Sequence, residues 1–321
     1  MDVARLKKIA AFYGRFLVSF SAIGYRARSL LWRPLRADFT DQIWVVTGAT
    51  GGIGRAVVEG AVRRGATVIA MARSPGKLDA LVRETPGPGR IEPLVVDLSL
   101  VGDTQRAAAE LLARGVRIDV LVNNVGLLLD DLTMTSEGFE TSYATNLLNH
   151  WVLTQALLNG EAVKPQGTVI EMSSGGMYNA PLTLDYMGMK NPKKYNGVYA
   201  YAVHKRGQAE LVKYWQGRYG ARGLRFYVMH PGWADTDGVK TAMPNFRRIL
   251  KSVLRNSAQG ADTALWLAAA RPSAGADAFW FDRAPRAAHA YPHTAVSKHT
   301  PDDLARLLDD QAAQVARGRA A

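Results

Sequence analysis

The sequence contains no cysteine among its 321 residues. This absence excludes disulfide bridges, metal sites built on thiolates and cysteine nucleophiles. It is typical of a protein that works in the cytoplasm. We predict no metal site of any kind.

Acidic side chains are scarce at the start of the chain. Residues 1–37 contain eight Lys or Arg and one acid, Asp2, which is a surplus of seven in a chain of net charge +12. A basic arm of this kind can bind a membrane or a nucleic acid. No helix-turn-helix, zinc-finger or aromatic RNA-binding signature accompanies it, so we expect no nucleic-acid partner.

The arm also lacks a long uninterrupted hydrophobic run. Residues 9–25 are largely apolar, but Arg15 interrupts them, whereas a transmembrane helix needs about 20 mostly apolar residues. No small-residue cleavage site follows a compact apolar run, so we expect no secretory signal. Aromatic and aliphatic residues flanked by Arg and Lys are typical of a helix at a membrane surface. We define residues 1–40 as a basic amphipathic arm. The sequence leaves open whether it contacts lipid, making a cytoplasmic protein peripheral at the membrane, or packs on protein.

Short apolar runs alternate with helical patterns from residue 41 onward. Strands are predicted at residues 43–48, 67–72, 94–98, 120–124, 168–173, 225–230 and 279–281. Alternation of this kind predicts parallel βαβ units. We therefore predict the α/β class, with a Rossmann-type doubly wound parallel sheet of about seven strands in a single domain over residues 41–282. Residues 283–321 form a tail with one helix, near 301–316.

A glycine-rich loop, TGATGGIG, joins the first predicted strand to the first helix at residues 47–54. Glycines allow a tight turn and a close approach to a pyrophosphate, whose charge the helix N-terminus favours. The position between strand and helix makes the motif specific. The candidate cofactor-binding residues of this loop are Gly48, Thr50, Gly51, Gly52, Ile53 and Gly54.

The end of the second predicted strand indicates which dinucleotide binds. A carboxylate there would accept hydrogen bonds from the ribose 2′-hydroxyl and repel a 2′-phosphate. This chain has Arg73 instead, and Arg55 follows the glycine loop. Guanidinium groups suit phosphate, so we predict NADP (NADPH) and treat NAD as the alternative. Arg55 alone is equally consistent with a solvated position on the helix.

A Tyr-x-x-x-Lys pattern occurs twice, as Tyr186/Lys190 and Tyr201/Lys205. On a helix this spacing brings both side chains to one face. A lysine ammonium stabilises the phenolate and lowers the ordinary tyrosine pKa of about 10. The tyrosine can then act as a general acid or base.

The backbone preferences of the neighbouring residues distinguish the two Tyr-x-x-x-Lys pairs. Lys190 and Asn191 precede Pro192, which disfavours helix before it, and Gly188 weakens a helix further. Residues 198–219 contain no proline and form the crossover helix between the fifth and sixth predicted strands. We therefore predict Tyr201 and Lys205 as the catalytic pair. The other match is then either accidental or part of a substrate rim at residues 177–197, with Met177, Tyr178, Leu182, Leu184, Tyr186, Met187 and Met189 as its apolar residues.

The motifs occur in a characteristic order. The glycine loop is followed by NNVG at 123–126, Asn146, SSGG at 173–176, the Tyr-x-x-x-Lys pattern and HPGWADT at 230–236. Together they resemble the short-chain dehydrogenase/reductase family over about residues 43–282. The stretches SSGGM, MHPGWADT, AMPNF and QGADTALWLA resemble its retinol-dehydrogenase-like branch. The family has Ala where this chain has Val125, which we interpret as a packing variation.

The resemblance implies roles for further residues. Ser174 would hydrogen-bond the substrate oxygen, with Ser173 as the alternative. Asn146 would link Lys205 to solvent through water, or be an ordinary helix residue. Thr236 would contact the nicotinamide carboxamide. The remaining cofactor-binding candidates implied are Asp97, Leu98, Asn123, Asn124, Val125, Gly126, Tyr201, Lys205, Pro231, Gly232 and Ala234.

The function implied is an NADP-dependent oxidoreductase that interconverts an alcohol and a carbonyl on a lipophilic small molecule. Related enzymes are often dimers or tetramers, so a homo-oligomer is one expectation. A non-enzymatic dinucleotide sensor or partner-binding protein on the same fold is the alternative. A sugar-nucleotide epimerase or dehydratase also uses a Tyr/Lys pair, but little chain remains after residue 282 for its substrate domain.

Overall fold

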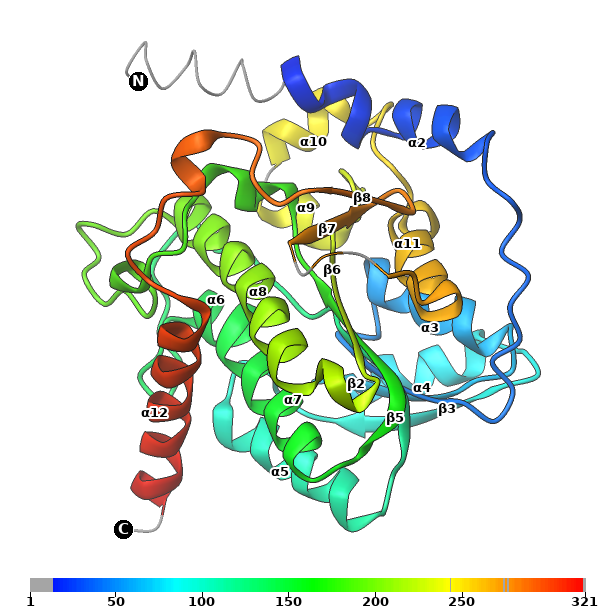
Figure 1. Cartoon of the computed structure of the whole chain (residues 1–321), viewed down its shortest axis with the longest axis horizontal. Helices are drawn as coiled ribbons and strands as arrows, with labels where there is room; N and C mark the ends of the chain where they lie inside the picture. Colours follow the sequence, from blue (N-terminus) through cyan, green and yellow to red (C-terminus); the bar gives the residue numbers. More distant parts are fainter. Residues whose placement is uncertain (1–13, 243, 274, 276, 320–321) are drawn as a thin grey trace.

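The computed structural model describes residues 14–319 except 243, 274 and 276, and its centre is an eight-stranded sheet (Figure 1). The strand order is β3-β2-β1-β4-β5-β6-β7-β8. The first seven strands run parallel and β8 is antiparallel to β7. The strands are β1 (Ile43–Thr47), β2 (Thr67–Ala72), β3 (Arg90–Val95), β4 (Ile118–Asn123), β5 (Val163–Met172), β6 (Arg225–Met229), β7 (Ala278–Phe281) and β8 (Ala284–Ala287).

The doubly wound Rossmann-type fold predicted from the sequence is confirmed, but the strand count of about seven is one too low. The eighth strand, β8, reads APRA and pairs with β7 at the edge of the sheet. It contains a proline and an arginine and lacks an apolar pattern. An edge strand tolerates both residues because one of its sides needs no ladder hydrogen bonds.

Helices cover both faces of the sheet (Figure 1). One face packs against α3 (Gly52–Val62), α4 (Pro75–Glu84) and α11 (Ser257–Ala270). The other packs against α5 (Val101–Ala113), α7 (Asn149–Asn159) and α8 (Gly197–Tyr219). Because both faces are covered, the central strands are nearly continuous runs of buried residues, as in β1.

Short helices shape the edge of the sheet where the parallel strands end. They are α6 (Thr141–Tyr143), the π-helical turn η1 (Ala144–Leu148), the 3₁₀ turns η2 (Gly175–Asn179) and η3 (Leu184–Tyr186), α9 (Asp237–Ala242) and α10 (Pro244–Leu250). Two further 3₁₀ turns, η4 (Gly220–Arg222) and η5 (Pro292–Thr294), lie in later connections.

The C-terminal helix α12 (Pro301–Arg319) packs against the body of the protein. Its Leu304 and Leu308 are fully buried in the same core as α5, α7 and α8. Trp151 on α7 donates a 2.8 Å hydrogen bond to the Asp309 carboxylate. The tail therefore contributes to the core of the domain.

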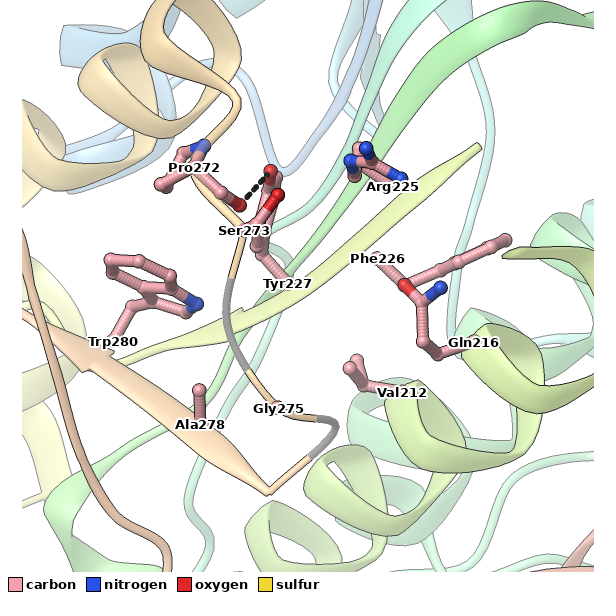
Figure 2. Close-up of a pocket in the computed structure, with 10 residues that line it drawn as sticks. All are labelled: Val212, Gln216, Arg225, Phe226, Tyr227, Pro272, Ser273, Gly275, Ala278 and Trp280. Atoms are coloured by element: carbon pink, nitrogen blue, oxygen red, sulfur yellow. Dashed lines mark hydrogen bonds between the residues drawn. The ribbon is translucent and has the colours of Figure 1, made fainter. Parts of the chain in front are cut away.

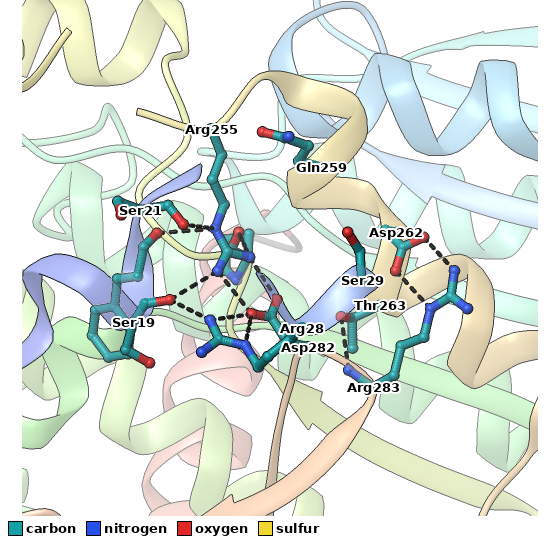
Figure 3. Close-up of polar contacts among 12 residues, drawn as sticks. Ser19, Ser21, Arg28, Ser29, Arg255, Gln259, Asp262, Thr263, Asp282 and Arg283 are labelled. Atoms are coloured by element: carbon teal, nitrogen blue, oxygen red, sulfur yellow. Dashed lines mark hydrogen bonds and ion pairs between the residues drawn. The ribbon is translucent and has the colours of Figure 1, made fainter. Parts of the chain in front are cut away.

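The N-terminal arm is helical over residues 14–20 and in α2 (Ala22–Ser29), and it docks on its own domain. The buried Phe20 ring packs against Trp233 and Phe281. Arg255 donates to the backbone carbonyls of Ser19 and Phe20, while its guanidinium pairs with Asp282 at 2.6 Å (Figure 3). This part of the arm packs as the protein-packing interpretation predicts. Residues 1–13 lie outside the described residues.

Candidate active site

The glycine-rich loop forms the turn between β1 and α3 that the sequence predicts. Gly48 and Gly52 adopt left-handed φ values of +64° and +51°. A Cβ on Gly54 would lie 2.2 Å from the Gly48 carbonyl oxygen, so only glycine fits there. Gly51 precedes α3 without a side-chain cap, and a Cβ built on it would meet no atom within 4 Å. The uncapped amides of α3 and the open space beside Gly51 fit a dinucleotide pyrophosphate.

The NNVG segment braces the loop from the neighbouring strand β4. The Thr47 hydroxyl accepts hydrogen bonds from the backbone amides of Asn124 and Val125, at 2.9 and 3.0 Å. The Asn124 side-chain amide donates to the Thr47 carbonyl at 2.9 Å. Asn124 and Val125 therefore fix the carboxyl ends of β1 and β4 relative to each other. Asn123 is buried and turns toward α7, where it bonds Thr154.

The two cations proposed for the 2′-phosphate differ in their surroundings. Arg73 is exposed at the end of β2 and makes no ion pair with any described residue. Arg55 lies 2.8 Å from the Glu59 carboxylate and 3.0 Å from that of Glu84, which together raise the pKa of Arg55. Neither acid was predicted as a partner of Arg55 from the sequence, and of the two candidate cations Arg73 is the one without a carboxylate partner among the described residues.

The adenine-side candidates lie at the end of β3. The Asp97 carboxylate accepts hydrogen bonds from the amide and hydroxyl of Ser99, at 2.9 and 2.7 Å. Leu98 is buried in the core. Asp97 therefore remains at the edge of the sheet with one carboxylate oxygen bonded locally.

Tyr201 and Lys205 lie on α8, which begins at a cap formed by the Asn196 side chain. The Lys205 ammonium lies 5.5 Å from the centre of the Tyr201 ring and donates a 2.8 Å hydrogen bond to the Met172 carbonyl on β5. The prediction of a continuous helix at this pair is confirmed. Each side chain points toward the carboxyl end of β5.

The alternative pair does not share a helix. Tyr186 ends the 3₁₀ turn η3, and Lys190 lies beyond that turn in irregular chain. The Tyr186 hydroxyl donates to the Lys194 carbonyl at 3.1 Å and accepts from the Asn196 amide at 2.7 Å. Tyr186 therefore stabilises the loop that leads into α8.

The two consecutive serines have different partners. The Ser174 hydroxyl accepts from the Gly176 amide at 3.1 Å, and a Cβ on Gly176 would lie 3.6 Å from that hydroxyl and 3.5 Å from the Tyr201 ring. Ser173 is buried and donates to the Lys205 carbonyl at 2.8 Å. Ser174 thus lies beside the tyrosine, whereas Ser173 ties β5 to α8.

Burial changes the acidity of both α8 residues. Desolvation raises the pKa of Tyr201, and the hydrogen bond from Ser174 partly offsets this. Desolvation lowers the pKa of Lys205 to about 8, while the nearby Glu171 carboxylate acts in the opposite direction. A phenol beside an ammonium can give a proton to an oxygen, and the phenolate that remains can take a proton back.

Asn146 lies in the π-helical turn η1 and faces the same region. Its side-chain amide makes two hydrogen bonds with the Leu127 backbone, at 2.8 and 2.7 Å. A Cβ on Gly126 would lie 3.2 Å from the Asn146 side-chain oxygen and 3.3 Å from the Lys205 nitrogen. Gly126 therefore keeps a gap between the two side chains open.

The segment after β6 closes the other side of the glycine loop. Gly232 has φ +78°, and a Cβ there would overlap Arg255. Thr236 lies against Gly52, since a Cβ on Gly52 would be 3.1 Å from its methyl group. A polar cavity of about 220 Å³ lies between the segment and the loop. Its lining residues are Gly52, Asp235, Thr236, Lys240, Arg247 and Ser257. Pro231 and the buried Ala234 lie on the same segment.

The predicted substrate rim at residues 177–197 is wrong for several of its side chains. Met177, Leu182 and Met187 are buried in the main core, and the Tyr178 hydroxyl donates to the Ala287 carbonyl. Their apolar character serves packing, because this insertion folds down onto α8 and β8.

A second pocket of about 150 Å³ lies at the far end of β6 (Figure 2). Arg225 begins β6 there, whereas the active-site segment leaves the opposite end of that strand. The Tyr227 hydroxyl closes one side by donating to the Pro272 carbonyl at 2.9 Å. This pocket is therefore separate from the candidate catalytic residues Ser174, Tyr201 and Lys205.

The chain is similar to known proteins over most of its length. The short chain dehydrogenase family matches residues 42–245. Dehydrogenase/reductase SDR family member 12 of Bos taurus is 33% identical over 317 residues, which cover 96% of this chain and 98% of that protein. Retinol dehydrogenase 13 of Homo sapiens is 26% identical, covering 70% and 71%.

Solved structures show the same fold. A protein assigned as an NAD(P) dependent gluconate 5-dehydrogenase from Beutenbergia cavernae, with bound NADP at low occupancy, is 25% identical with a TM-score of 0.59. The match covers 72% of this chain and 91% of that one. The chain therefore belongs to the short-chain dehydrogenase/reductase family, in its retinol-dehydrogenase-like branch, and is an NAD(P)-dependent oxidoreductase acting on CH–OH groups.

Proposed function

We propose that this protein uses NADP to interconvert an alcohol and a carbonyl on a lipophilic small molecule, with Tyr201 as the general acid and base. One observation carries the proposal. Ser174 and Tyr201 both lie beside Gly176, where a Cβ would be 3.5 Å from the Tyr201 ring and 3.6 Å from the Ser174 hydroxyl, and the Lys205 ammonium lies 5.5 Å from the centre of the same ring. A phenol, a hydroxyl and an ammonium at the carboxyl end of β5 are the groups that carbonyl chemistry requires.

Each of these residues has a separate role at the substrate oxygen. The bound nicotinamide supplies or accepts the hydride. In reduction, Tyr201 donates its proton to the carbonyl oxygen, and in oxidation the phenolate takes the proton back. Ser174 donates a hydrogen bond to that oxygen and orients it. The Lys205 ammonium stabilises the phenolate that remains after proton transfer.

An apolar substrate is favoured by the similarity to Retinol dehydrogenase 13, since retinol is a largely apolar alcohol. We expect NADPH oxidation with hydrophobic aldehydes and ketones to exceed that with sugars. Turnover of sugar nucleotides would favour the epimerase alternative. Tight NADPH binding without turnover of any carbonyl would favour a non-enzymatic sensor.

The preference for NADP is supported by Arg73, which is exposed and has no described carboxylate partner. The relative from Beutenbergia cavernae binds NADP. We expect Arg73→Ala to weaken NADPH binding about tenfold, which corresponds to ~1.4 kcal/mol, and to leave NADH binding unchanged. Fluorescence titration of wild type and variant measures both constants.

Arg83→Ala is the matched control for this titration, since Arg83 is exposed on the adjacent helix α4. It should leave both affinities unchanged. Equal affinity of the wild type for NADPH and NADH would contradict the NADP assignment. So would a loss of both affinities in Arg73→Ala.

We also propose that the N-terminal arm touches a membrane surface while packed on its domain. Leu30 and Leu31 are 85% and 88% exposed directly after α2, and Val18 and Ile23 are exposed on the same arm. Exposed Ile249 lies on α10, which adjoins the arm (Figure 1). Arginines flank these apolar side chains, and this combination suits an anionic lipid surface. Among the described residues, no helix is long and apolar enough to cross a bilayer. Assembly into a homo-oligomer stays a prediction.

A further inference from the structure

A buried polar cluster lies next to the catalytic residues and is not part of them. Glu171 lies one residue before the carboxyl end of β5, in the buried half of that strand, and has 0% exposure. One carboxylate oxygen accepts a 2.6 Å hydrogen bond from the Asn123 amide. The other lies 2.8 Å from Nδ1 of His150, which is 1% exposed on α7. A buried carboxylate needs a charged or hydrogen-bonding partner, and His150 is positioned to act as that partner.

The hydrogen bonds of His150 fix where its protons lie. Nε2 is 2.9 Å from the Val125 carbonyl oxygen, which can only accept, so Nε2 carries a proton. A second proton must lie between Nδ1 and Glu171, because two lone pairs would otherwise face each other. The pair is therefore an imidazolium and a carboxylate, or shares the equivalent proton.

The cluster reaches both the cofactor loop and the catalytic lysine. A Cβ on Gly48 would lie 3.0 Å from the Val125 Cα, so the backbone that His150 holds abuts the glycine loop. Gln208 lies one turn after Lys205 on α8, within 3.2 Å of His150 Nδ1. Lys205 itself bonds the carbonyl of Met172, the residue after Glu171.

Few other charged groups face Lys205 among the described residues. Its ammonium lies over the Tyr201 ring on its own helix. His204 also interacts with it, but that imidazole turns toward Glu140, 3.6 Å away, and toward the Tyr143 ring. Glu171 is the carboxylate that stabilises the ammonium, against a burial that lowers the pKa of Lys205.

We propose that Glu171 and His150 are positioning residues: Glu171 stabilises the Lys205 ammonium electrostatically, while His150 moderates that charge and fixes the Val125 carbonyl beside the glycine loop. Neither side chain touches the reacting oxygen. This inference rests on the proposed function, because it assigns Lys205 its role. It also makes a prediction that needs no substrate.

The test begins with Glu171→Gln, which is isosteric. The new amide can accept from Asn123 and donate to a neutral His150, so the hydrogen bonds survive while the charge is lost. In the fold, burial holds the pKa of Lys205 at about 8 instead of the ordinary 10.5. The resulting destabilisation is greatest below about pH 8 and disappears as the pH rises toward the unfolded value. Removing Glu171 lowers the folded pKa further, so the loss of Tm in the variant should be large near pH 7 and shrink near pH 9.5.

Two variants separate charge from packing. Thr154→Val removes the other partner of Asn123 without changing a charge, so its Tm loss should not depend on pH. Glu171→Asp keeps the carboxylate, and its Tm loss should also depend little on pH. A loss in Glu171→Gln that is constant with pH, as in Thr154→Val, would overturn the proposal.

Catalysis gives a second readout, the pH profile of NADPH-dependent reduction of a hydrophobic aldehyde. In Glu171→Gln the pH at which activity is lost should fall, because Glu171 raises the pKa of Lys205. His150→Gln leaves the Glu171 carboxylate without its imidazolium partner, so the pH at which activity is lost should rise. This opposite sign keeps the proposal testable if Glu171→Gln does not fold. If both variants are active and lose activity at the same pH as the wild type, the positioning role is refuted. An inactive wild type would refute the proposed function, but the Tm comparison would remain valid.

Discussion

Lys205 meets two opposing requirements at one position. Lys205 is buried beside the Tyr201 ring, whereas the role that we propose for it, stabilising a phenolate, requires it to keep its charge. Desolvation alone favours the neutral amine. Its hydrogen bond to the Met172 carbonyl and the nearby Glu171 carboxylate compensate in part. Its protonation is therefore sensitive to pH near neutrality.

This predicts the pH dependence of reduction. Because the pKa of Lys205 is lowered to about 8, the ammonium is present below that pH and lost above it. We expect kcat/KM for carbonyl reduction to be level below about pH 8 and to fall roughly tenfold for each further unit. Initial rates from about pH 6 to 10 measure this. A rate that rises through pH 8 would contradict the role given to Lys205.

The choice between the two tyrosines could be made from local sequence, whereas the cluster beneath them could not. Pro192 and Gly188 exclude a helix at Tyr186 by backbone effects alone. The contact of Glu171 with His150 depends on how α7 packs on β5, which no local pattern encodes. A glutamate inside an apolar strand was the one available signal, because a buried carboxylate requires a partner.

Among the elements, the N-terminal arm depends on a buried ion pair. Arg255 and Asp282 are each 1% exposed in their side chains and are held together at 2.6 Å. Arg28 on α2 also bonds Asp282, at 2.7 Å (Figure 3). The same guanidinium of Arg255 bonds the arm's backbone, so the arm and the segment after β6 share one anchor.

Asp282→Ala should therefore destabilise the protein strongly. It leaves two guanidinium groups without their carboxylate, and breaking a buried pair in this way costs about 3–5 kcal/mol. Glu161→Ala is the control, because its ion pair with Arg222 is exposed to solvent, and we expect it to cost about 1 kcal/mol or less. Denaturant unfolding compares the two. Equal losses of unfolding free energy in the two variants would show that the buried Arg255–Asp282 pair contributes no more to stability than the control pair.

Sequence patterns predicted some secondary-structure elements correctly and missed others. The buried parallel strands and α8 follow from apolar runs and the absence of proline. The edge strand β8 was missed because its pairing with β7 needs no apolar residues. A substrate rim was one of two interpretations of the insertion before α8, but Met177 and Leu182 fill the core instead. Apolar residues in a loop indicate burial without saying against what.

At the scale of the whole molecule, the positive charge is concentrated in the arm, together with exposed apolar side chains. Leu30→Ser with Leu31→Ser should reduce sedimentation with phosphatidylserine-containing vesicles several-fold, because partitioning scales with buried apolar area. Val296→Ser is the control, since Val296 is also exposed but follows the 3₁₀ turn η5. Unchanged sedimentation of the double variant, or a wild type that does not sediment, would contradict the membrane proposal.

The fold and the family were predictable from the ensemble of motifs, because each motif sits on the element that its chemistry requires. Charge pairing was less predictable. Arg55 followed the glycine loop as a phosphate candidate, yet it pairs with Glu84, which is 29 positions later in the sequence. Contacts of this range follow from the packing of α3 beside α4, and only the three-dimensional structure reveals them.

The most direct test of the account compares Tyr201→Phe with Tyr186→Phe. Each variant loses one hydroxyl from a Tyr-x-x-x-Lys pattern. NADPH binding and NADPH-dependent reduction of a hydrophobic aldehyde are measured for both. We predict that Tyr201→Phe, which keeps the ring, binds NADPH within a few-fold of the wild type but reduces the aldehyde about 10²–10⁴-fold more slowly, while Tyr186→Phe stays within about twofold of the wild type. Full activity in Tyr201→Phe, or its loss in Tyr186→Phe alone, would contradict the assignment of the active site.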